Sequence, residues 1–365
     1  MNVVISCGGT GGHITPALAI ADMLRENLPR VSITFIGTDG GMENALVAAA
    51  GYPIHTLAAC GISRRDPIKA LSAWQQLHRA TDRAEVLLRK LAPAIVIGTG
   101  SYACYPALAS ACRMGLKTAV HESNTVPGLA VRLLAARLSR VWLGFAETAA
   151  HLPKRAKVLF VGNPVSHSFY QAPPQGRCAH TEKTVLSFGG SLGATAINNA
   201  VLHLMLTMRA YANVSFVHAT GKREFEPFME RLSKTELASD RRFTVLPFIS
   251  DMPRRMHEAD LVIARAGAMT ISELAAAGCA AVLVPSPNVT GNHQLKNAKA
   301  LAAAGAAALV EEKELLRGEL IKTVSRLLND DSARGKMQGA ILRYGSPHAT
   351  RLILEDILTL TRKKG

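Results

Sequence analysis

The feature that most constrains the fold of this chain is a unit that occurs twice. VISCGGTGG (residues 4–12) and VLSFGGSLG (residues 185–193) align without gaps. In each copy a short apolar run leads into a Gly-Gly-hydroxyl-x-Gly turn, and a helical pattern follows. A buried strand that passes through a glycine turn into a helix is the building unit of parallel α/β sheets. We therefore expect two similar α/β halves, each opening with this unit.

Short apolar runs alternate with helical patterns along the whole chain. The strands expected in the first half are residues 3–6, 31–37, 94–100, 117–122 and 158–164, with helices at 17–27 and 80–91. The strands expected after the second glycine turn are residues 214–220, 243–248, 261–267 and 280–285. Nearly continuous apolar strands with helices between them indicate parallel sheets covered by helices on both faces.

The two halves are separated by a polar, proline-rich stretch, residues 163–183, which has the composition of a linker. This predicts domains at 1–162 and 184–346. Ser346-Pro347 is a helix-start signal, and a terminal helix is expected over 347–365. Its apolar residues share one face. They are Leu352, Ile353, Ile357 and Leu360.

The charge balance favours an anionic partner. Lys and Arg number 42 against 27 Asp and Glu, a net charge of +15, which suits nucleic acid, an acidic membrane surface or a phosphorylated substrate. A hydrophobic content of 48% argues against disorder. The six cysteines form no CxxC pair, so buried free thiols in a reducing compartment are expected. We expect neither a secretion signal nor a membrane-spanning segment.

The glycine turns predict binding sites for phosphate. Such a turn leaves free N–H groups at a helix N-terminus, where the helix dipole also favours an anion. A tight turn without a ligand is the alternative for either copy alone. Two common nucleotide fingerprints do not fit, because GxGxxG fails at Ile14 and GxxxxGK[ST] is absent. This weakens the case for a dinucleotide oxidoreductase and for a P-loop ATPase.

Three further features carry polar side chains suited to a sugar nucleotide. His13 ends the first glycine turn, where it is either a capping or core histidine or a neutral base. Thr270-x-x-Glu273 matches a capping box, but a carboxylate there also fits the two hydroxyls of a ribose. GNHQLKNA (291–298) is either an ordinary helix start or a source of amide hydrogen bonds to a sugar from Asn292, Gln294 and Asn297.

Six ordered motifs together resemble a known family. They are GGTGGH (8–13), HESN (121–124), GNPV (162–165), GGSLGA (189–194), RAGAMTISELAAAG (265–278) and NHQLKNA (292–298). The chain resembles, over residues 1 to 350, the MurG family of bacterial cell-wall N-acetylglucosaminyltransferases. The resemblance implies the GT-B glycosyltransferase fold, with two Rossmann-like domains facing across a cleft and the C-terminal helix packing back on the first domain. It also implies transfer of N-acetylglucosamine from UDP to the 4-hydroxyl of the muramoyl sugar of lipid I, with inversion to a β-1,4 link, giving lipid II.

The resemblance assigns roles to residues of the first domain. Thr10, Gly11 and Gly12 are expected to border the donor sugar. Asn124 is expected to contact its N-acetylglucosamine. His13 becomes the candidate catalytic base.

In the second domain, the resemblance places the loop of Ser191 at the UDP diphosphate and the backbone of Ile249 at the uracil. Glu273 is expected to bind the ribose hydroxyls, Gln294 the sugar, and Arg265 to lie near the nucleotide. Many members carry an arginine after GNPV where this chain has Ser166, so that contact is not carried over. No DxD motif is present, and neither a metal nor another cofactor is expected.

A basic amphipathic segment predicts contact with a membrane. Within residues 61–79, Ile68, Leu71 and Trp74 recur at helical spacing. The surrounding basic residues are Arg64, Arg65, Lys69 and Arg79. Such a helix binds anionic headgroups, although its apolar stripe would equally suit packing inside the domain. The resemblance favours a peripheral position on the cytoplasmic face of the cell membrane.

Two other classes of protein compete with this interpretation. A nucleic-acid-binding protein would suit the charge, but aromatic residues make up only 5%, the basic residues are dispersed and no recognition motif is present, so no nucleic acid is expected. Another GT-B enzyme, such as a UDP-sugar epimerase, would share the donor motifs. HESN and GGTGGH, in the domain expected to bind the acceptor, argue against it.

Overall fold

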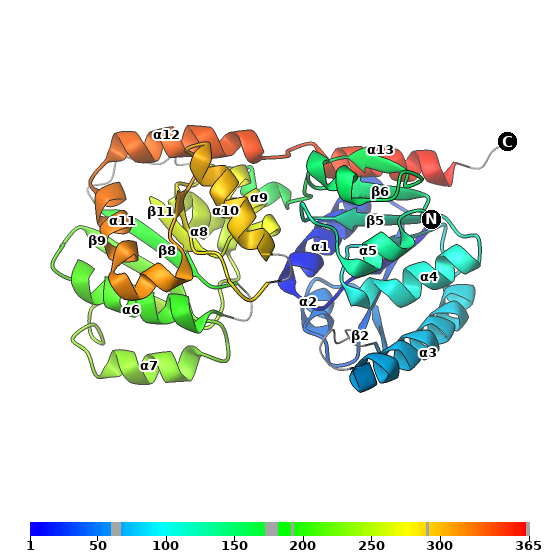
Figure 1. Cartoon of the computed structure of the whole chain (residues 1–365), viewed down its shortest axis with the longest axis horizontal. Coiled ribbons are helices and arrows are strands. Elements are labelled where there is room, and N and C mark those ends of the chain that lie inside the picture. Colours follow the sequence, from blue (N-terminus) through cyan, green and yellow to red (C-terminus); the bar gives the residue numbers. More distant parts are fainter. Residues whose placement is uncertain (60–66, 172–181, 191–192, 290–291, 363–365) are drawn as a thin grey trace. The chain divides into compact units, whose positions relative to one another are not determined.

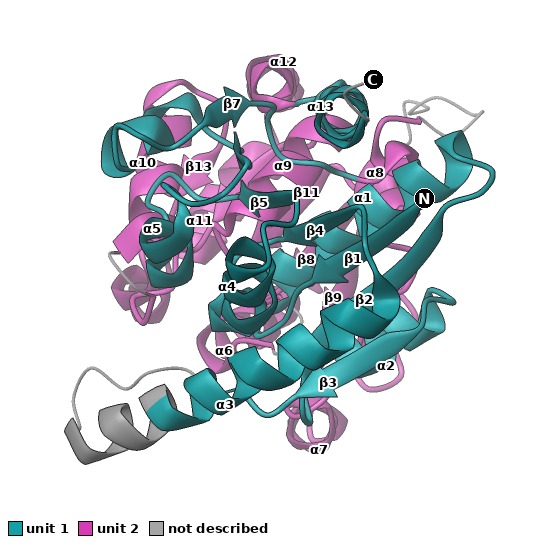
Figure 2. Ribbon diagram, turned by 90° about the vertical axis from the view of Figure 1, so that its right-hand side faces the viewer, with its two compact units in different colours: residues 1–165, 346–365 teal, residues 166–345 magenta. Residues whose placement is uncertain are grey.

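The computed structural model describes residues 1–59, 67–171, 182–190, 193–289 and 292–362, with only the backbone described over 67–74. The chain forms two compact units, coloured separately in Figure 2. Unit 1 comprises Met1–Val165 together with Ser346–Gly365, and unit 2 comprises Ser166–Gly345. Unit 2 is therefore inserted, along the chain, into unit 1.

Unit 1 is built on a seven-stranded sheet in which all the strands run parallel. Its strands are β1 (Asn2–Ser6), β2 (Ser32–Thr38), β3 (Ile54–Leu57), β4 (Ile95–Gly98), β5 (Thr118–Glu122), β6 (Arg140–Leu143) and β7 (Val158–Phe160). Their order is β3-β2-β1-β4-β5-β6-β7. The order reverses at β1 and β4, the place where ligands bind in open sheets of this kind.

Helices cover both faces of this sheet (Figure 1). Each face has its own apolar core. The first core joins α1 (Gly11–Asn27), α2 (Glu43–Ala49) and α13 (Ala349–Thr361) to strand residues such as Val3 and Ile5. The second joins α3 (Pro67–Leu91), α4 (Tyr105–Arg113) and α5 (Leu129–Leu134) to Val4 on the opposite face. Two short 3₁₀ helices, η1 (Tyr102–Cys104) and η2 (Ala146–His151), complete the unit. Alternate residues of one strand thus face different helix layers.

Unit 2 holds a second parallel sheet, of six strands in the order β10-β9-β8-β11-β12-β13. The strands are β8 (Lys183–Phe188), β9 (Val214–Ala219), β10 (Phe243–Leu246), β11 (Leu261–Ala264), β12 (Ala281–Leu283) and β13 (Ala308–Leu309). The helices are α6 (Thr195–Met208), α7 (Phe225–Ser233), α8 (Met252–Glu258), α9 (Ala268–Ala277), α10 (His293–Ala303), α11 (Glu319–Leu328) and α12 (Asp331–Ile341). The 3₁₀ helices are η3 (His167–Phe169), η5 (Glu312–Arg317) and η6 (Leu342–Tyr344). Helices α6, α7 and α11 share one apolar core with the strands.

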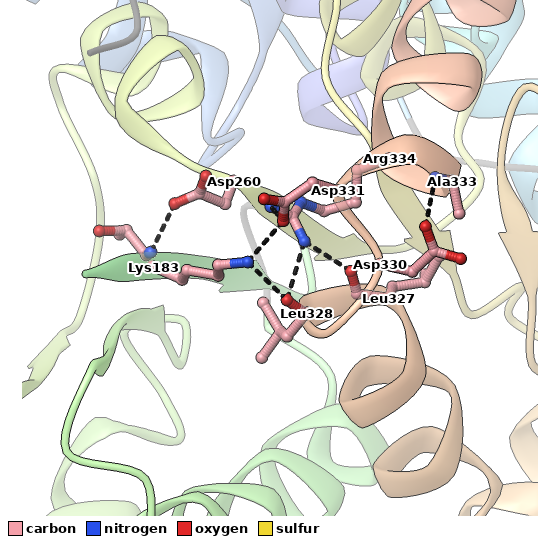
Figure 3. A network of polar contacts seen from close by, with 9 residues as sticks. Lys183, Asp260, Leu327, Leu328, Asp330, Asp331, Ala333 and Arg334 are labelled. Atoms are coloured by element: carbon pink, nitrogen blue, oxygen red, sulfur yellow. Dashed lines mark hydrogen bonds and ion pairs between the residues drawn. The ribbon is translucent and has the colours of Figure 1, made fainter. Parts of the chain in front are cut away.

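A polar network joins the start of β8 to the junction of α11 and α12 (Figure 3). Lys183 Nζ donates to the carbonyl of Leu328 at 2.7 Å and to the Asp331 carboxylate at 2.5 Å. The buried guanidinium of Arg334 donates to the carbonyls of Leu327 and Leu328 and to Asp331. Cations at the end of a helix satisfy carbonyls that have no partner within it. The network therefore caps α11 and fixes the turn into α12.

The α/β class, the parallel sheets and both strand–turn–helix units are confirmed. Three strands were not expected from the sequence: β3, β6 and β13, of four, four and two residues. The first helix was expected from residue 17 but begins at Gly11, so His13 lies inside its first turn. The terminal helix was expected from residue 347 but begins at Ala349.

Candidate functional site

The first glycine loop ends at the start of α1. Thr10 is the N-cap residue, but its side chain makes no capping hydrogen bond. The backbone N–H groups of Gly11 and Gly12 lie in the first turn, where a helix offers them no internal partner. Thr10 and Gly12 are exposed. This loop therefore presents free donors and the positive end of the α1 dipole to a ligand.

His13 is held in one orientation. Its Nδ1 lies 2.8 Å from the carbonyl oxygen of Thr99. A carbonyl oxygen only accepts hydrogen bonds, so Nδ1 carries the hydrogen and Nε2 of a neutral ring has a free lone pair. This is the form of histidine that a catalytic base requires.

The turn after β4 supports His13, and the sequence reasoning missed it. Thr99 Oγ1 donates to the backbone carbonyl of His13 at 2.6 Å. Gly100 has φ +90°, and a Cβ atom on it would lie 2.9 Å from His13 Nδ1. The available signal was a third strand followed by small residues, IVIGTGS (95–101), but its relevance depends on β4 lying beside β1.

The HESN segment follows β5, the next strand of the same sheet. Glu122 is buried, and its carboxylate accepts hydrogen bonds from the backbone N–H and the side-chain Nδ2 of Asn124, both at 3.0 Å. It also accepts one from the N–H of Gly128 at 2.9 Å. Asn124 is thereby oriented with its Oδ1 left as an acceptor. Burial lowers the pKa of the neighbouring His121 to about 4, so this histidine is neutral at pH 7.

The predicted residues of unit 1 share one edge of its sheet. Thr10, Gly11, Gly12 and His13 follow β1, and Asn124 follows β5. The turn of Thr99 follows β4, which lies between these two strands. Carboxyl ends of parallel strands meet at the same edge, and this edge is the usual ligand site of such sheets.

The second glycine loop, after β8, is only partly described. Ser191 lies outside the described residues, so its predicted role stays a prediction. Gly193 has φ +79°, and a Cβ atom on it would lie 2.1 Å from the carbonyl oxygen of Thr220, so only glycine fits. Asn198 Nδ2 donates to that same carbonyl at 3.0 Å. The loop thus packs directly on the turn after β9.

Glu273 lies in the second turn of α9, and the capping-box alternative is wrong. The helix begins at Ala268 after the N-cap Gly267, so Thr270 is inside it and makes no cap. Among the described residues, none donates a hydrogen bond to the Glu273 carboxylate. Its removal from water raises the pKa of Glu273 to about 8. An unpartnered carboxyl group of this kind suits a ligand that brings its own hydroxyl donors.

The three other predicted residues of unit 2 lie after β10, directly after β11 and at the start of α10. Ile249 comes after β10, and its backbone makes no hydrogen bond to the described residues, which leaves both groups for a base. Gln294 Oε1 accepts from the N–H of Ser286 at 2.9 Å. Arg265 forms an ion pair with Glu312 at 2.5 Å and donates to the carbonyl of Val284. The Arg265 charge is therefore already matched by a carboxylate, a partner that the sequence reasoning missed.

Two other predictions can be placed. Asn297 is buried and its side-chain Nδ2 donates to the carbonyl of Ala266 at 3.3 Å, a contact that favours the structural alternative for this residue. Ile68, Leu71 and Trp74 fall on the α3 backbone, but their side chains lie outside the described part of the chain. Among the described residues, no helix is both long enough and apolar enough to cross a membrane.

Known proteins resemble this chain over its whole length. The glycosyltransferase family 28 N-terminal and C-terminal domain models match residues 3–143 and 184–348. A UDP-N-acetylglucosamine--N-acetylmuramyl-(pentapeptide) pyrophosphoryl-undecaprenol N-acetylglucosamine transferase from Desulforudis audaxviator is 37% identical, with 100% of this chain and 99% of the relative covered. The transferase of the same name from Acetivibrio thermocellus is 35% identical, with 100% and 99% covered.

A solved structure gives the same result. The crystal structure of Acinetobacter baumannii MurG matches with a TM-score of 0.75 at 30% identity, covering 98% of this chain and 99% of that one. Two parallel-sheet units of the family 28 type give this chain the GT-B fold. On full-length identity, domain content and structural similarity, the chain belongs to the MurG family of glycosyltransferases.

Proposed function

We propose that this protein transfers N-acetylglucosamine from UDP-N-acetylglucosamine to the 4-hydroxyl of the muramoyl sugar of lipid I, undecaprenyl-diphospho-MurNAc-pentapeptide. The products are lipid II and UDP. The observation that carries the proposal is the match, over the full length of the chain, to relatives named for this transfer. The orientation of His13 supports it, because the chemistry needs a base at a hydroxyl group.

Unit 2 binds the nucleotide in this proposal. The helix dipole of α6 and the loop of Ser191 stabilise the diphosphate, and the free backbone groups of Ile249 receive the uracil. The Glu273 carboxylate accepts hydrogen bonds from the two ribose hydroxyls. Gln294 binds the sugar through its amide. Arg265 lies near the nucleotide and is held there by its ion pair with Glu312.

The reaction is a single displacement that inverts the anomeric carbon. The acceptor oxygen forms a bond to C1 of N-acetylglucosamine while the bond from C1 to the UDP oxygen breaks, and UDP leaves with the electron pair. His13 Nε2 takes the proton of the acceptor hydroxyl as the sugar develops positive charge. Thr10, Gly11 and Gly12 border the donor sugar, and Asn124 Oδ1 accepts from its acetamido N–H. The product is a β-1,4 link.

The proposal places the protein on the cytoplasmic face of the cell membrane, where its lipid-linked acceptor resides. The N-terminal part of α3 is the contact segment, through Ile68, Leu71 and Trp74. The net charge of +15 attracts an anionic surface. The proposal includes no nucleic-acid partner.

The test is transfer of labelled N-acetylglucosamine from UDP to a short-chain lipid I analogue. We expect activity in the wild type and a loss on the order of 100-fold or more in His13→Ala. His55→Ala, an exposed histidine on β3, is the matched control and should keep wild-type activity. Wild-type activity in His13→Ala would remove His13 as the base. No transfer by folded wild type that still binds UDP would overturn the proposed acceptor.

Membrane contact is tested separately, by co-sedimentation with vesicles containing phosphatidylglycerol. Trp74→Ser should weaken binding, whereas Val86→Ser should not, although Val86 is an apolar residue of the same helix and 56% exposed. Equal binding by both variants and the wild type would contradict the contact segment.

A further inference from the structure

We propose that Thr99 is a positioning residue that fixes the tautomer and orientation of His13. The proposal rests on the proposed function, in which His13 Nε2 receives the proton of the acceptor hydroxyl. Nothing in the sequence motifs marks Thr99. Its role follows from the position of the turn after β4, beside the start of α1.

Thr99 engages His13 at two points. Its carbonyl oxygen accepts from Nδ1 of the ring at 2.8 Å, and its hydroxyl donates to the backbone carbonyl of His13 at 2.6 Å. One contact controls the ring and the other controls the main chain from which the ring projects. Two contacts at separate points leave the side chain little freedom to swing away from the first turn of α1.

Burial strengthens both contacts. Thr99 is fully buried, so water does not compete for its hydroxyl. Hydrogen bonds shielded in this way are stronger than exposed ones. Ile97, two residues earlier on β4, belongs to the apolar core of the same unit. The turn that contains Thr99 therefore follows a strand that is packed in this core. The geometry of His13 is thus set by the sheet rather than by a mobile loop.

The backbone of Gly100 also restricts the orientation of the His13 ring. Its backbone lies so near the imidazole that a Cβ atom would come within 2.9 Å of Nδ1 and 3.0 Å of Cε1. The ring therefore packs on the backbone of Gly100 with Nδ1 directed at Thr99. Since Nδ1 carries the hydrogen in this position, Nε2 is the atom left to accept a proton.

The neighbouring histidine does not compete for this role. His121 on β5 is buried, and its Nε2 donates to the carbonyl of Gly162 at 3.0 Å. Ser123 Oγ lies 3.3 Å from its Nδ1. Both ring nitrogens of His121 are thus occupied inside the unit. His13 differs, because only one of its ring nitrogens is engaged by described residues.

The first test reads the tautomer directly. In protein labelled with ¹⁵N-histidine, two-bond ¹⁵N–¹H correlations distinguish an Nδ1–H ring from an Nε2–H ring, and the His13→Ala spectrum identifies the His13 signals. We expect the Nδ1–H form in the wild type and in Thr99→Ser, which keeps the hydroxyl. Thr99→Val, which keeps the backbone carbonyl at Nδ1 and loses only the hydroxyl, should also show the Nδ1–H form. An Nε2–H ring in the wild type overturns the proposal without any variant.

The second test measures the effect of each variant on kcat and on KM separately. Thr99→Val should lower kcat about tenfold, the cost of one hydrogen bond, with KM for UDP-N-acetylglucosamine unchanged, and Thr99→Ser should restore kcat. The matched control is Thr81→Val on α3, which removes a buried hydroxyl bonded at 2.7 Å to the carbonyl of Leu77. This control should lose stability but keep kcat and the Nδ1–H ring.

The outcomes distinguish this proposal from the proposed function. If His13→Ala retains full transfer, His13 is not the base, but the spectra still show whether Thr99 orients it. If Thr99→Val keeps the wild-type kcat, or if the wild type shows an Nε2–H ring, the positioning role is wrong while the transfer reaction stands.

Discussion

Arg140 on β6 and Asp356 on α13 form a bidentate ion pair although they lie 216 positions apart in the chain. Arg140 Nε and Nη2 each donate to a different carboxylate oxygen at 2.9 Å. Trp142, two residues along the same strand, donates from Nε1 to Asp356 at 2.8 Å. Asp356 is 8% exposed, so this carboxylate depends on three donors of β6 rather than on water. The pair fixes the terminal helix to the sheet of unit 1.

Replacing Asp356 by Ala should destabilise unit 1 by about 3 kcal/mol, because the partly buried Arg140 and the fully buried Trp142 N–H would be left without an acceptor. The free energy of unfolding in urea, followed by tryptophan fluorescence, measures this effect. Trp142 is fully buried and reports on unit 1. Glu355→Ala is the control, since its contact with Arg351 is 3.9 Å long and exposed, and the change should be below about 0.5 kcal/mol. Equal losses in the two variants would contradict the importance of the buried pair.

Gly100→Ala should abolish most transfer activity, because the added methyl group would displace the His13 ring and strain the backbone at φ +90°. We expect kcat to fall on the order of 100-fold, as for loss of the base. Gly115→Ala is the matched control, with φ +70° and open space around the new methyl group. It should lose about 1 kcal/mol of stability through its backbone alone and keep its activity. Similar kcat values for the two variants would show that the ring does not depend on Gly100.

Binding of UDP should release protons through Glu273. Its pKa of about 8 means that the free protein holds this carboxyl group protonated at pH 7, whereas the ribose hydroxyls need the carboxylate as acceptor. Binding therefore lowers the pKa, and the affinity should rise as the pH rises from 6 to 8. Calorimetry in two buffers of different ionisation enthalpy should detect about one proton released per UDP at pH 7.

Glu273→Gln provides the control for that titration. The variant should bind UDP more weakly and lack the proton release of this position, while any titration of the UDP phosphates stays the same. It should also gain stability relative to the wild type as the pH rises from about 4.5 to 8, because over this range the unfolded wild-type chain loses the proton of this carboxyl group while the folded protein, in which burial disfavours the charge, still holds it. A proton release equal to that of the wild type would assign the titration to another group.

Acid should destabilise both units through buried histidines. Burial lowers the pKa of His121 in unit 1 and of His218 in unit 2 to about 4. Unfolding lets each histidine take up a proton below about pH 6.5, so the free energy of unfolding should fall as the pH drops from 6.5 towards 4. We expect a loss of about 2 kcal/mol per histidine between pH 7 and pH 5.

Variants of unit 2 isolate one of these contributions. His218→Gln should remove the acid-dependent loss of unit 2 in urea unfolding at the two pH values. His203→Gln, at an exposed position of α6, should leave it unchanged. An unaltered pH dependence in His218→Gln would show that this histidine is not the responsible group.

The parts of the fold predicted from the sequence are those with a local signal. Residues 3–6 and 185–188 are apolar on both faces, and the glycines that follow mark the turn into a helix. β3 carries two polar, exposed residues among its four, and β13 has only two residues, so neither shows a periodicity that identifies a strand. α1 begins at two glycines, which are poor helix formers, and its start was therefore expected too late.

The same distinction, between residues with a local sequence signal and residues without one, applies to the candidate site. His13, Asn124 and Glu273 lie within the motifs that carry the resemblance, so the sequence could predict roles for them. Thr99 acts on His13 only because β4 lies beside β1, an arrangement set by strand order rather than by neighbouring residues. Likewise, the partner of Arg265 lies on η5, far along the chain, and the ion pair appears only once the chain is folded.

The position of α13 has a consequence for the order in which the chain matures. Ile353 and Ile357 belong to the same apolar core as β1 and α1, yet a ribosome makes them after all of unit 2. Domains often fold as units during synthesis, beginning from the N-terminus. Unit 1 does not follow this order: the inserted unit is synthesised before α13, so the segment that carries His13 gains this helix only after all of unit 2 has been made.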